Sequence, residues 1–195
     1  MKVVIAPQSF KGSISALDVA RAMRVGVLKA IPNAETILIP VADGGDGTLE
    51  TLVQGSDGQI IAMNVLGPLG DKIEAQWGAM GDGVTAVIEM ARTSGLALIP
   101  DNKRNPLITT TYGLGQAVKQ AMGDGFRKFV VGIGGSATND AGAGMAQALG
   151  IRLLDAYGNE LGFGGEELSR LANIDMSRLD KRIKECKFEV ACDVN

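Results

Sequence analysis

Apolar and polar positions change their spacing twice along this chain of 195 residues. The first apolar run, Lys2 to Ala6, is short and β-branched and stops at Pro7, which predicts a strand. Apolar residues then recur at helical spacing from Ala16 to Ile31, and Ser15 and Asp18 are placed as a capping box at the start. This first segment is therefore expected to be a strand followed by an amphipathic helix.

A second apolar run, Thr36 to Val41, leads into the loop Asp43 to Thr48. Strand, helix and strand in this order predict a right-handed parallel crossover.

The apolar spacing changes to two between about Gly55 and Ile99. Residues 73–79 and 84–90 alternate apolar with polar or small residues, and a Gly-Asp-Gly turn separates them. Runs of this kind joined by tight turns predict an antiparallel meander. We therefore expect residues 55–99 to form a smaller, inserted, largely antiparallel subdomain.

Helical spacing returns near Thr111 and is followed by the continuous apolar run Phe129 to Ile133. Such a run is typical of a strand that is buried on both faces of a parallel sheet. A last short run, Phe188 to Ala191, predicts one more strand. The expected fold class is α/β, with residues 1–54 and 100–195 forming a discontinuous parallel-sheet domain.

Composition narrows the chemistry. The chain has 46% hydrophobic and 21% charged residues, a net charge of −3 and no basic run, so nucleic acid and anionic membranes are not expected as partners. No apolar stretch is long enough for a signal peptide or a membrane span, which favours a cytoplasmic protein. The absence of histidine excludes Ser-His-Asp hydrolysis and histidine-ligated zinc. Carboxylates, lysine, hydroxyls, backbone amides and a hard metal ion remain.

Three polar loops follow predicted strands, at the sheet edge where open α/β proteins bind ligands. The first loop holds Ser9 and Lys11 and opens a helix, where a cation suits a phosphate or carboxylate. Taken alone, this loop is better explained as a solvent-exposed lysine beside a capping serine. The second loop places Asp43 and Asp46 among three glycines, and a pair of loop carboxylates suits Mg²⁺. Its alternative interpretation is a turn in which Asp46 or Thr48 only caps the next helix.

The third loop runs from Gly132 to Asp140, and successive glycines and small polar residues before a helix offer several amide donors to phosphate. It lacks the Gly-Lys-Ser/Thr of a Walker A loop and the spacing of a dinucleotide fingerprint. Asp193 follows the last strand and adds a carboxylate at the same edge. Together the loops supply what phosphoryl transfer requires, without naming the substrate.

The three loops together resemble the bacterial type-1 glycerate kinase family. The matching stretches cover essentially the whole chain in order, and they are residues 6–13, 40–48, 88–96, 132–150, 162–165 and 190–194. The string Gly-Ile-Gly-Gly-Ser-Ala-Thr-Asn-Asp at residues 132–140 is the most specific of them. The resemblance implies ATP and Mg²⁺ as cofactors, glycerate as the small-molecule substrate, and phosphoryl transfer usually to the 2-hydroxyl. It also implies a three-layer, Rossmann-like or flavodoxin-like parallel sheet with a smaller second domain.

Expected roles follow for eleven residues, one of which, Asp193, has two roles. The expected catalytic residues are Lys11, Asp43 and Asp193, and the expected substrate-binding residues are Ser9 and Asp46. Phosphate or nucleotide binding is expected at Gly134, Gly135, Ser136, Thr138 and Asn139. The expected metal ligands are Asp140 and Asp193.

Members of the resembled family are roughly twice as long as this chain, a length that two domains would fill. We therefore expect this chain to be a fragment or a split gene product whose active-site edge is incomplete. The expected partner that completes the edge is either a C-terminal half or another copy in a homo-oligomer. Two alternatives to a glycerate kinase stay open. One is a truncated, non-catalytic module that binds nucleotide or glycerate, and the other is a different phosphate-handling α/β enzyme.

Overall fold

The computed structural model describes residues 1–10 and 13–192 of the chain. The α-helices are α1 (Ala16–Ala30), α2 (Thr48–Gly55), α3 (Met90–Ser94), α4 (Tyr112–Gly123) and α5 (Ala143–Ala148). The strands are β1 (Lys2–Ile5), β2 (Glu35–Leu38), β3 (Gln59–Leu66), β4 (Lys72–Ala79), β5 (Thr85–Glu89), β6 (Lys128–Gly132), β7 (Arg152–Leu154), β8 (Asn173–Asp175) and β9 (Lys187–Ala191). Short 3₁₀ turns span Leu96–Leu98, Asp101–Lys103, Gly165–Arg170 and Lys181–Glu185.

A five-stranded mixed sheet in the order β3-β4-β5-β6-β9 forms the centre of the molecule. The pairs β3–β4 and β4–β5 are antiparallel, whereas β5–β6 and β6–β9 are parallel. In the parallel part, the last residues of the three strands, Glu89, Gly132 and Ala191, lie side by side in register. One edge of the sheet therefore collects the carboxyl ends of three neighbouring strands, the usual position of a ligand site.

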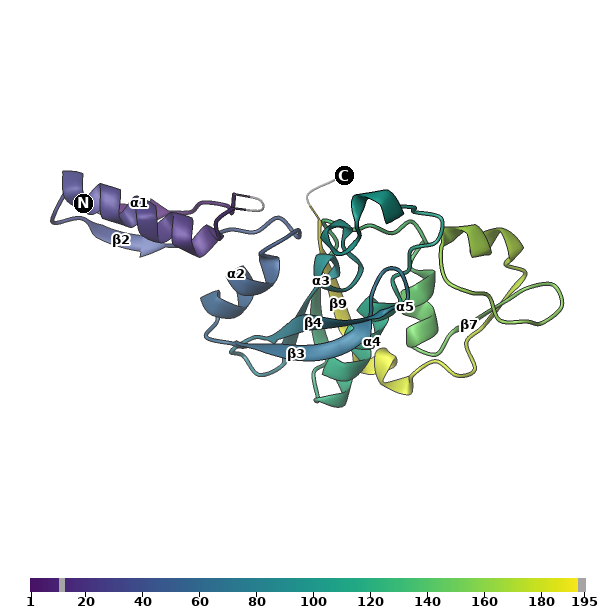
Figure 1. Ribbon diagram of the computed structural model, residues 1–195. Helices are drawn as coiled ribbons and strands as arrows, with labels where there is room; N and C mark the ends of the chain where they lie inside the picture. The colour runs from purple at the N-terminus through teal and green to yellow at the C-terminus, as the bar shows by residue number, and fades with distance from the viewer. Residues whose placement is uncertain (11–12, 193–195) are drawn as a thin grey trace.

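Helices cover both faces of this sheet (Figure 1). The helical stripe that begins at Leu114 places α4 against the larger core, which includes Trp77, Ile88 and Phe129. Leu49 and Val53 of α2 pack against Val87 on the opposite face. Strand β5 is buried on both faces because Ile88 and Val87 point in opposite directions, as adjacent residues of a strand must. The arrangement is three layers deep.

Strands β1 and β2 form a separate two-stranded parallel sheet, and α1 connects them as the predicted crossover. Helix α1 begins with the predicted capping box, since the Ser15 hydroxyl oxygen accepts the Asp18 amide at 3.1 Å and donates to the Asp18 carboxylate at 2.7 Å. Figure 1 shows this β1–α1–β2 unit beside the main body, joined to it through the segment that leads into α2. Several of its apolar side chains, including Val4, Val25 and Ile39, are exposed.

The expected single parallel sheet is wrong. Within the described residues, β1 and β2 pair only with each other, and the strands of residues 55–99 join β6 and β9 in one mixed sheet. Strand β4 is antiparallel to both β3 and β5, but the three strands are not a separate sheet because β5 pairs with β6. Local apolar spacing indicates a strand and its buried faces, whereas the choice of neighbour depends on contacts distant in sequence. The domain boundaries at residues 54 and 99 stay a prediction.

Candidate functional site

Two of the three polar loops meet at the carboxyl edge of the parallel strands. The Gly134 amide donates a 3.0 Å hydrogen bond to the carbonyl oxygen of Gly44. The backbones lie so close that a Cβ on Gly134 would be 2.6 Å from the Gly45 Cα, and a Cβ on Gly44 would be 2.2 Å from the Ala191 oxygen. Both distances are too short for any side chain, so glycine is required by close approach at these two positions. The loop of residues 43–47 is thus seated on the ends of β6 and β9.

A cavity of about 330 Å³ lies where these loops meet, and we call it the glycine-loop cavity. Its walls include Asp43, Asp46, Gly47, Gly134 and Gly135. The side chains of Asp43 and Asp46 are exposed, and one Asp43 oxygen accepts the Gly45 amide at 2.9 Å. A Cβ on Gly135 would be 3.6 Å from an Asp46 carboxylate oxygen, so this carboxylate faces the third loop. The structure therefore brings together two predicted carboxylates and two predicted phosphate-binding glycines.

Backbone amides add donors to this cavity. Among the described residues, the amides of Gly47 and Gly135 have no hydrogen-bond partner. Gly47 is the N-cap of α2, so its amide also lies at the positive end of the helix dipole. Donors of this kind favour an anion such as phosphate.

The first loop contributes Ser9, which also lines the glycine-loop cavity. Its hydroxyl lies 3.8 Å from the place that a Cβ on Gly47 would occupy. Ser9, Asp46 and Gly47 also line an adjoining cavity of about 310 Å³ between the start of α1 and α2. Lys11, the predicted catalytic cation of this loop, lies outside the described residues, and so does Asp193.

Neither Asp46 nor Thr48 caps α2, so the alternative interpretation of the second loop is wrong. The N-cap residue is Gly47, with φ at +92°, and it has no side chain to accept a hydrogen bond. Instead, the amide of Leu49 donates at 2.9 Å to the carboxylate of Glu89, a residue 40 positions away. Glu89 is fully buried, and burial raises the pKa of its carboxyl above the ordinary range. The sequence analysis missed this residue.

The third loop is divided between two cavities. Gly134 and Gly135 line the glycine-loop cavity, whereas Ser136, Thr138 and Asn139 line a cavity of about 490 Å³ beside β6 and β9. We call the second one the sheet-face cavity; its other walls are mainly apolar and include Leu114, Ile133 and Val190. The Ser136 hydroxyl lies 2.8 Å from that of Thr138 and accepts the Thr138 amide at 3.0 Å, so the loop is held partly by its own side chains.

Asp140 is a buried capping residue in this structure. Its two oxygens accept hydrogen bonds from the amides of Thr111, Gly142 and Gly144 at 2.8–3.1 Å, and from the Thr111 hydroxyl. Asp140 and Thr111 are 29 residues apart in the chain, so this side chain links the start of α4 to the start of α5. A carboxylate saturated in this way does not fit the predicted role of metal ligand. Among the described residues, no group of three or more Asp, Glu, Cys or His side chains is placed to hold a metal ion.

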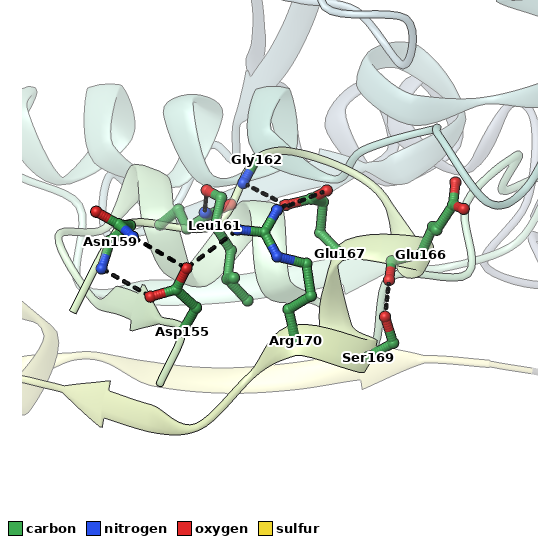
Figure 2. Close-up of polar contacts among 9 residues, drawn as sticks. Asp155, Asn159, Leu161, Gly162, Glu166, Glu167, Ser169 and Arg170 are labelled. Atoms are coloured by element: carbon green, nitrogen blue, oxygen red, sulfur yellow. Dashed lines mark hydrogen bonds and ion pairs between the residues drawn. The ribbon is translucent and has the colours of Figure 1, made fainter. Parts of the chain in front are cut away.

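A second polar cluster lies in the segment around β7, and its side chains line none of these three cavities (Figure 2). Asp155 accepts the amides of Tyr157 and Asn159, each at 2.9 Å, and pairs with Arg170 at 3.1 Å. The hydrogen bonds from Asn159 are the main cause that lowers the pKa of Asp155 to about 2. Arg170 also pairs with Glu167, whose carboxylate accepts the Gly162 amide. The cluster is internally satisfied and stabilises the loop conformation.

Fold and site together define an α/β protein whose polar loops and backbone amides meet at the carboxyl edge of parallel strands. None of the helices in the described ranges is both long and apolar enough to cross a membrane. A profile of the glycerate kinase family matches residues 3–195, and this chain belongs to that family.

Two curated relatives are named as kinases of glycerate. A glycerate kinase of Bacillus subtilis (strain 168) is 56% identical over 195 residues, which are 100% of this chain and 51% of the relative. A glycerate 2-kinase of Escherichia coli (strain K12) is 53% identical over 194 residues, with 100% of this chain and 51% of the relative covered. The chain thus spans about half the length of the curated relatives it matches.

A solved structure shows the same arrangement. The crystal structure of a protein assigned as glycerate kinase 2 from Salmonella typhimurium LT2 superposes with a TM-score of 0.91 at 50% identity. The match covers 100% of this chain and 52% of that chain. The fold described above is therefore that of one part of a longer family member.

Proposed function

We propose that this chain supplies the phosphate-binding and glycerate-binding edge of an ATP-dependent glycerate kinase. The observation that carries the proposal is the glycine-loop cavity, where the amides of Gly47 and Gly135 and the carboxylates of Asp43 and Asp46 surround one space. Phosphoryl transfer depends on positioning and on spreading phosphate charge, and this set of groups suits both needs. A cytoplasmic location, expected from the sequence, stays a prediction.

The phosphates of ATP would lie in the glycine-loop cavity, on the Gly47 and Gly135 amides. Its nucleoside would lie in the sheet-face cavity, which the same third loop lines through Ser136, Thr138 and Asn139 and whose apolar walls suit a base. A single loop would then contact both parts of the nucleotide. This placement preserves the predicted binding role of all five residues of the loop.

Asp43 and Asp46 are the described residues that would hold Mg²⁺. Both are exposed loop carboxylates on one cavity, and Mg²⁺ prefers a few hard oxygen ligands together with water and phosphate oxygens. The bound ion would supply neutralisation of phosphate charge. We leave Asp140 out of this set because its oxygens already accept hydrogen bonds from protein amides. Asp193 and Lys11 keep their expected roles as predictions.

Glycerate would occupy the adjoining cavity that shares Ser9 and Asp46 with the glycine-loop cavity. A hydroxyl of glycerate placed at this shared wall would face the terminal phosphate and lie beside the Asp46 carboxylate. The E. coli relative is named a glycerate 2-kinase, which favours the 2-hydroxyl as the acceptor.

Further polypeptide is expected to cover the β1–α1–β2 unit and the outer face of β9. A parallel pair of strands is rarely stable with both edges free, and Val4 on β1 and Val190 on β9 are exposed. Either a segment equivalent to the remaining part of the longer relatives or a second copy of this chain would serve.

A coupled assay of ADP release with and without racemic glycerate tests the proposal, run on the chain together with a segment equivalent to the remaining part of the longer relatives. Glycerate-dependent ADP release that requires Mg²⁺ is the expected result. Nucleotide binding without any glycerate-dependent turnover would favour the non-catalytic binding module instead. Turnover with a sugar phosphate but not with glycerate would favour a different phosphate-handling enzyme.

A further inference from the structure

Glu89 is a buried carboxylate directly beneath the candidate site. It is the last residue of β5, it is fully buried, and it lies in register with Gly132 and through it with Ala191 at the carboxyl edge of the sheet. Burial of a carboxylate carries a large desolvation penalty unless hydrogen bonds and nearby charges compensate for it. An apolar residue would fill this strand position at lower cost, so the carboxylate calls for a specific reason.

The first compensating contact is to helix α2. One Glu89 oxygen accepts the Leu49 amide at 2.9 Å, in the first turn of the helix. The first amides of a helix need acceptors, and the N-cap usually supplies one from its side chain. Gly47 has no side chain that could accept a hydrogen bond, and the Glu89 carboxylate of β5 accepts the Leu49 amide instead. Gly47 thereby stays free of a side chain where it borders the glycine-loop cavity.

The second contact is to Arg92 of α3. The Arg92 Nε atom lies 3.5 Å from the other Glu89 oxygen, and the same guanidinium pairs with Glu50 of α2 and donates to Gln76 of β4. Glu89 and Arg92 together therefore connect the sheet, α3 and α2. Helix α2 is held at two successive residues, Leu49 and Glu50.

The position of α2 determines the position of the loop before it. Asp46 and Gly47 directly precede the helix, and both line the glycine-loop cavity. Across the cavity, a Cβ added to Gly135 would be in van der Waals contact with Asp46, at 3.6 Å. A small displacement of α2 would change the separation of this carboxylate from the third loop. Glu89 itself lines none of the cavities described above.

We propose that Glu89 is a positioning residue for phosphoryl transfer, which acts by holding the first turn of α2 so that Asp46 and Gly47 face Gly135 at the correct distance. This inference rests on the function proposed above and adds a residue to it that does not contact substrate. The operative feature is the reach of the side chain to the Leu49 amide. The negative charge is secondary, because Glu50 also balances Arg92.

Two conservative variants separate reach from charge. Glu89→Gln keeps an oxygen at the same distance, whereas Glu89→Asp keeps the charge but withdraws it by about 1.5 Å, one carbon–carbon bond. The probe is the Mg²⁺ complex of the non-hydrolysable ATP analogue AMP-PNP, titrated into the ¹⁵N-labelled chain. We expect Glu89→Asp to bind about tenfold more weakly or worse, the scale seen for supporting residues behind a binding site. We expect Glu89→Gln to stay within about threefold of the unmodified chain, well below that scale.

The Leu49 amide gives a direct signature of the cap. Its hydrogen exchange is expected to accelerate in Glu89→Asp and to stay slow in Glu89→Gln, because only the second variant keeps an acceptor in place. Asp155→Ala is the matched control, since Asp155 is also a buried carboxylate that accepts backbone amides, but it lines none of the three cavities. It is expected to lower Tm without changing AMP-PNP affinity. All proteins are compared at the same interval below their own Tm.

The outcomes are distinct. Unchanged affinity in Glu89→Asp, or a loss of affinity in Asp155→Ala that matches its loss of Tm, would overturn the positioning role while leaving the proposed function intact. Failure of the unmodified chain to bind Mg²⁺–AMP-PNP would instead overturn the proposed function, and the inference with it. If Glu89→Asp does not fold, the Glu89→Gln chain still provides a test. A loss of AMP-PNP affinity beyond about tenfold in that variant would contradict the claim that the reach of the side chain matters more than its charge.

Discussion

The Gly134 amide donates a hydrogen bond of 3.0 Å to the Gly44 carbonyl oxygen, and this bond joins two loops that lie 90 residues apart in the numbering (134 against 44). The contact is backbone to backbone, so it depends on both residues being small. It places the Asp43–Thr48 loop directly on the carboxyl ends of β6 and β9. The candidate site exists only because this approach is so close.

Gly134→Ala should therefore destroy the site and destabilise the chain. The added Cβ would lie 2.6 Å from the Gly45 Cα. The nearest atoms that it would meet all belong to the backbone of Gly44 and Gly45, so no side chain can rotate to make room. We expect a loss of unfolding free energy of about 1–3 kcal/mol, the usual cost of overpacking. Chemical denaturation measures it, and titration of Mg²⁺–AMP-PNP should show no saturable binding in the variant.

Gly26→Ala is the matched control for that substitution. Gly26 lies inside α1, where nothing would lie within 4 Å of an added Cβ. Alanine is the better helix former, so the control should gain about 0.5–1 kcal/mol. If both glycine variants changed stability by the same amount, loop contact would not be the reason that Gly134 is required.

Asp43→Asn should weaken Mg²⁺-dependent nucleotide binding with little change in stability. The side chain is exposed, and the asparagine oxygen can still accept the Gly45 amide that now bonds to Asp43 at 2.9 Å. The variant loses a charged ligand but not the turn. Affinity for Mg²⁺–AMP-PNP should fall about tenfold, while Tm should move little, as is usual for an exposed loop. An unchanged magnesium titration would remove this loop from the proposed metal site.

Much of the local structure follows from the sequence because its causes are local. The capping box at Ser15 and the stripe that includes Leu114 both depend on residues within a few positions, and both elements form as expected. The alternating pattern of residues 73–79 likewise gives an antiparallel strand. Placement of the strand pair β1–β2 outside the main sheet does not follow, because sequence spacing says nothing of which strands become neighbours.

The candidate site shows the same limit at the level of single residues. Asp43 and Asp46 could be predicted from their glycine-rich loop, whereas Glu89 was missed because its partner amide is 40 residues away. One signal existed, namely a carboxylate at the end of an otherwise apolar strand. Asp140 is predicted as a metal ligand because it is one of several carboxylates on loops at the same edge of the sheet. Its distant partner Thr111 shows why that carboxylate is buried.

Acid should destabilise the chain in part through Asp155. The pKa of this carboxyl is lowered to about 2 by its hydrogen bonds from Asn159 and Tyr157, against an ordinary value of 3.8. Because the folded state lowers the pKa, the stabilisation is fully present above pH 3.8 and is lost as pH falls toward 2. Asp155→Asn should remove this contribution and flatten the curve of stability against pH in that window, measured by denaturation at several pH values. An unchanged slope would contradict the assignment.

The isolated chain should self-associate through the exposed apolar surface of its strands. Val4 of β1 and Val190 of β9 are 56% and 62% exposed, and both lie on strands with a free edge in the described part of the chain. Such edges and apolar side chains promote pairing with another chain. Light scattering after size-exclusion chromatography should show a mass that rises with concentration, and Val4→Lys combined with Val190→Lys should reduce it. Tyr157→Lys is the control, because Tyr157 is 91% exposed but lies in a loop rather than on a strand edge. A monodisperse monomer at all concentrations would refute the prediction and would show that these surfaces tolerate water.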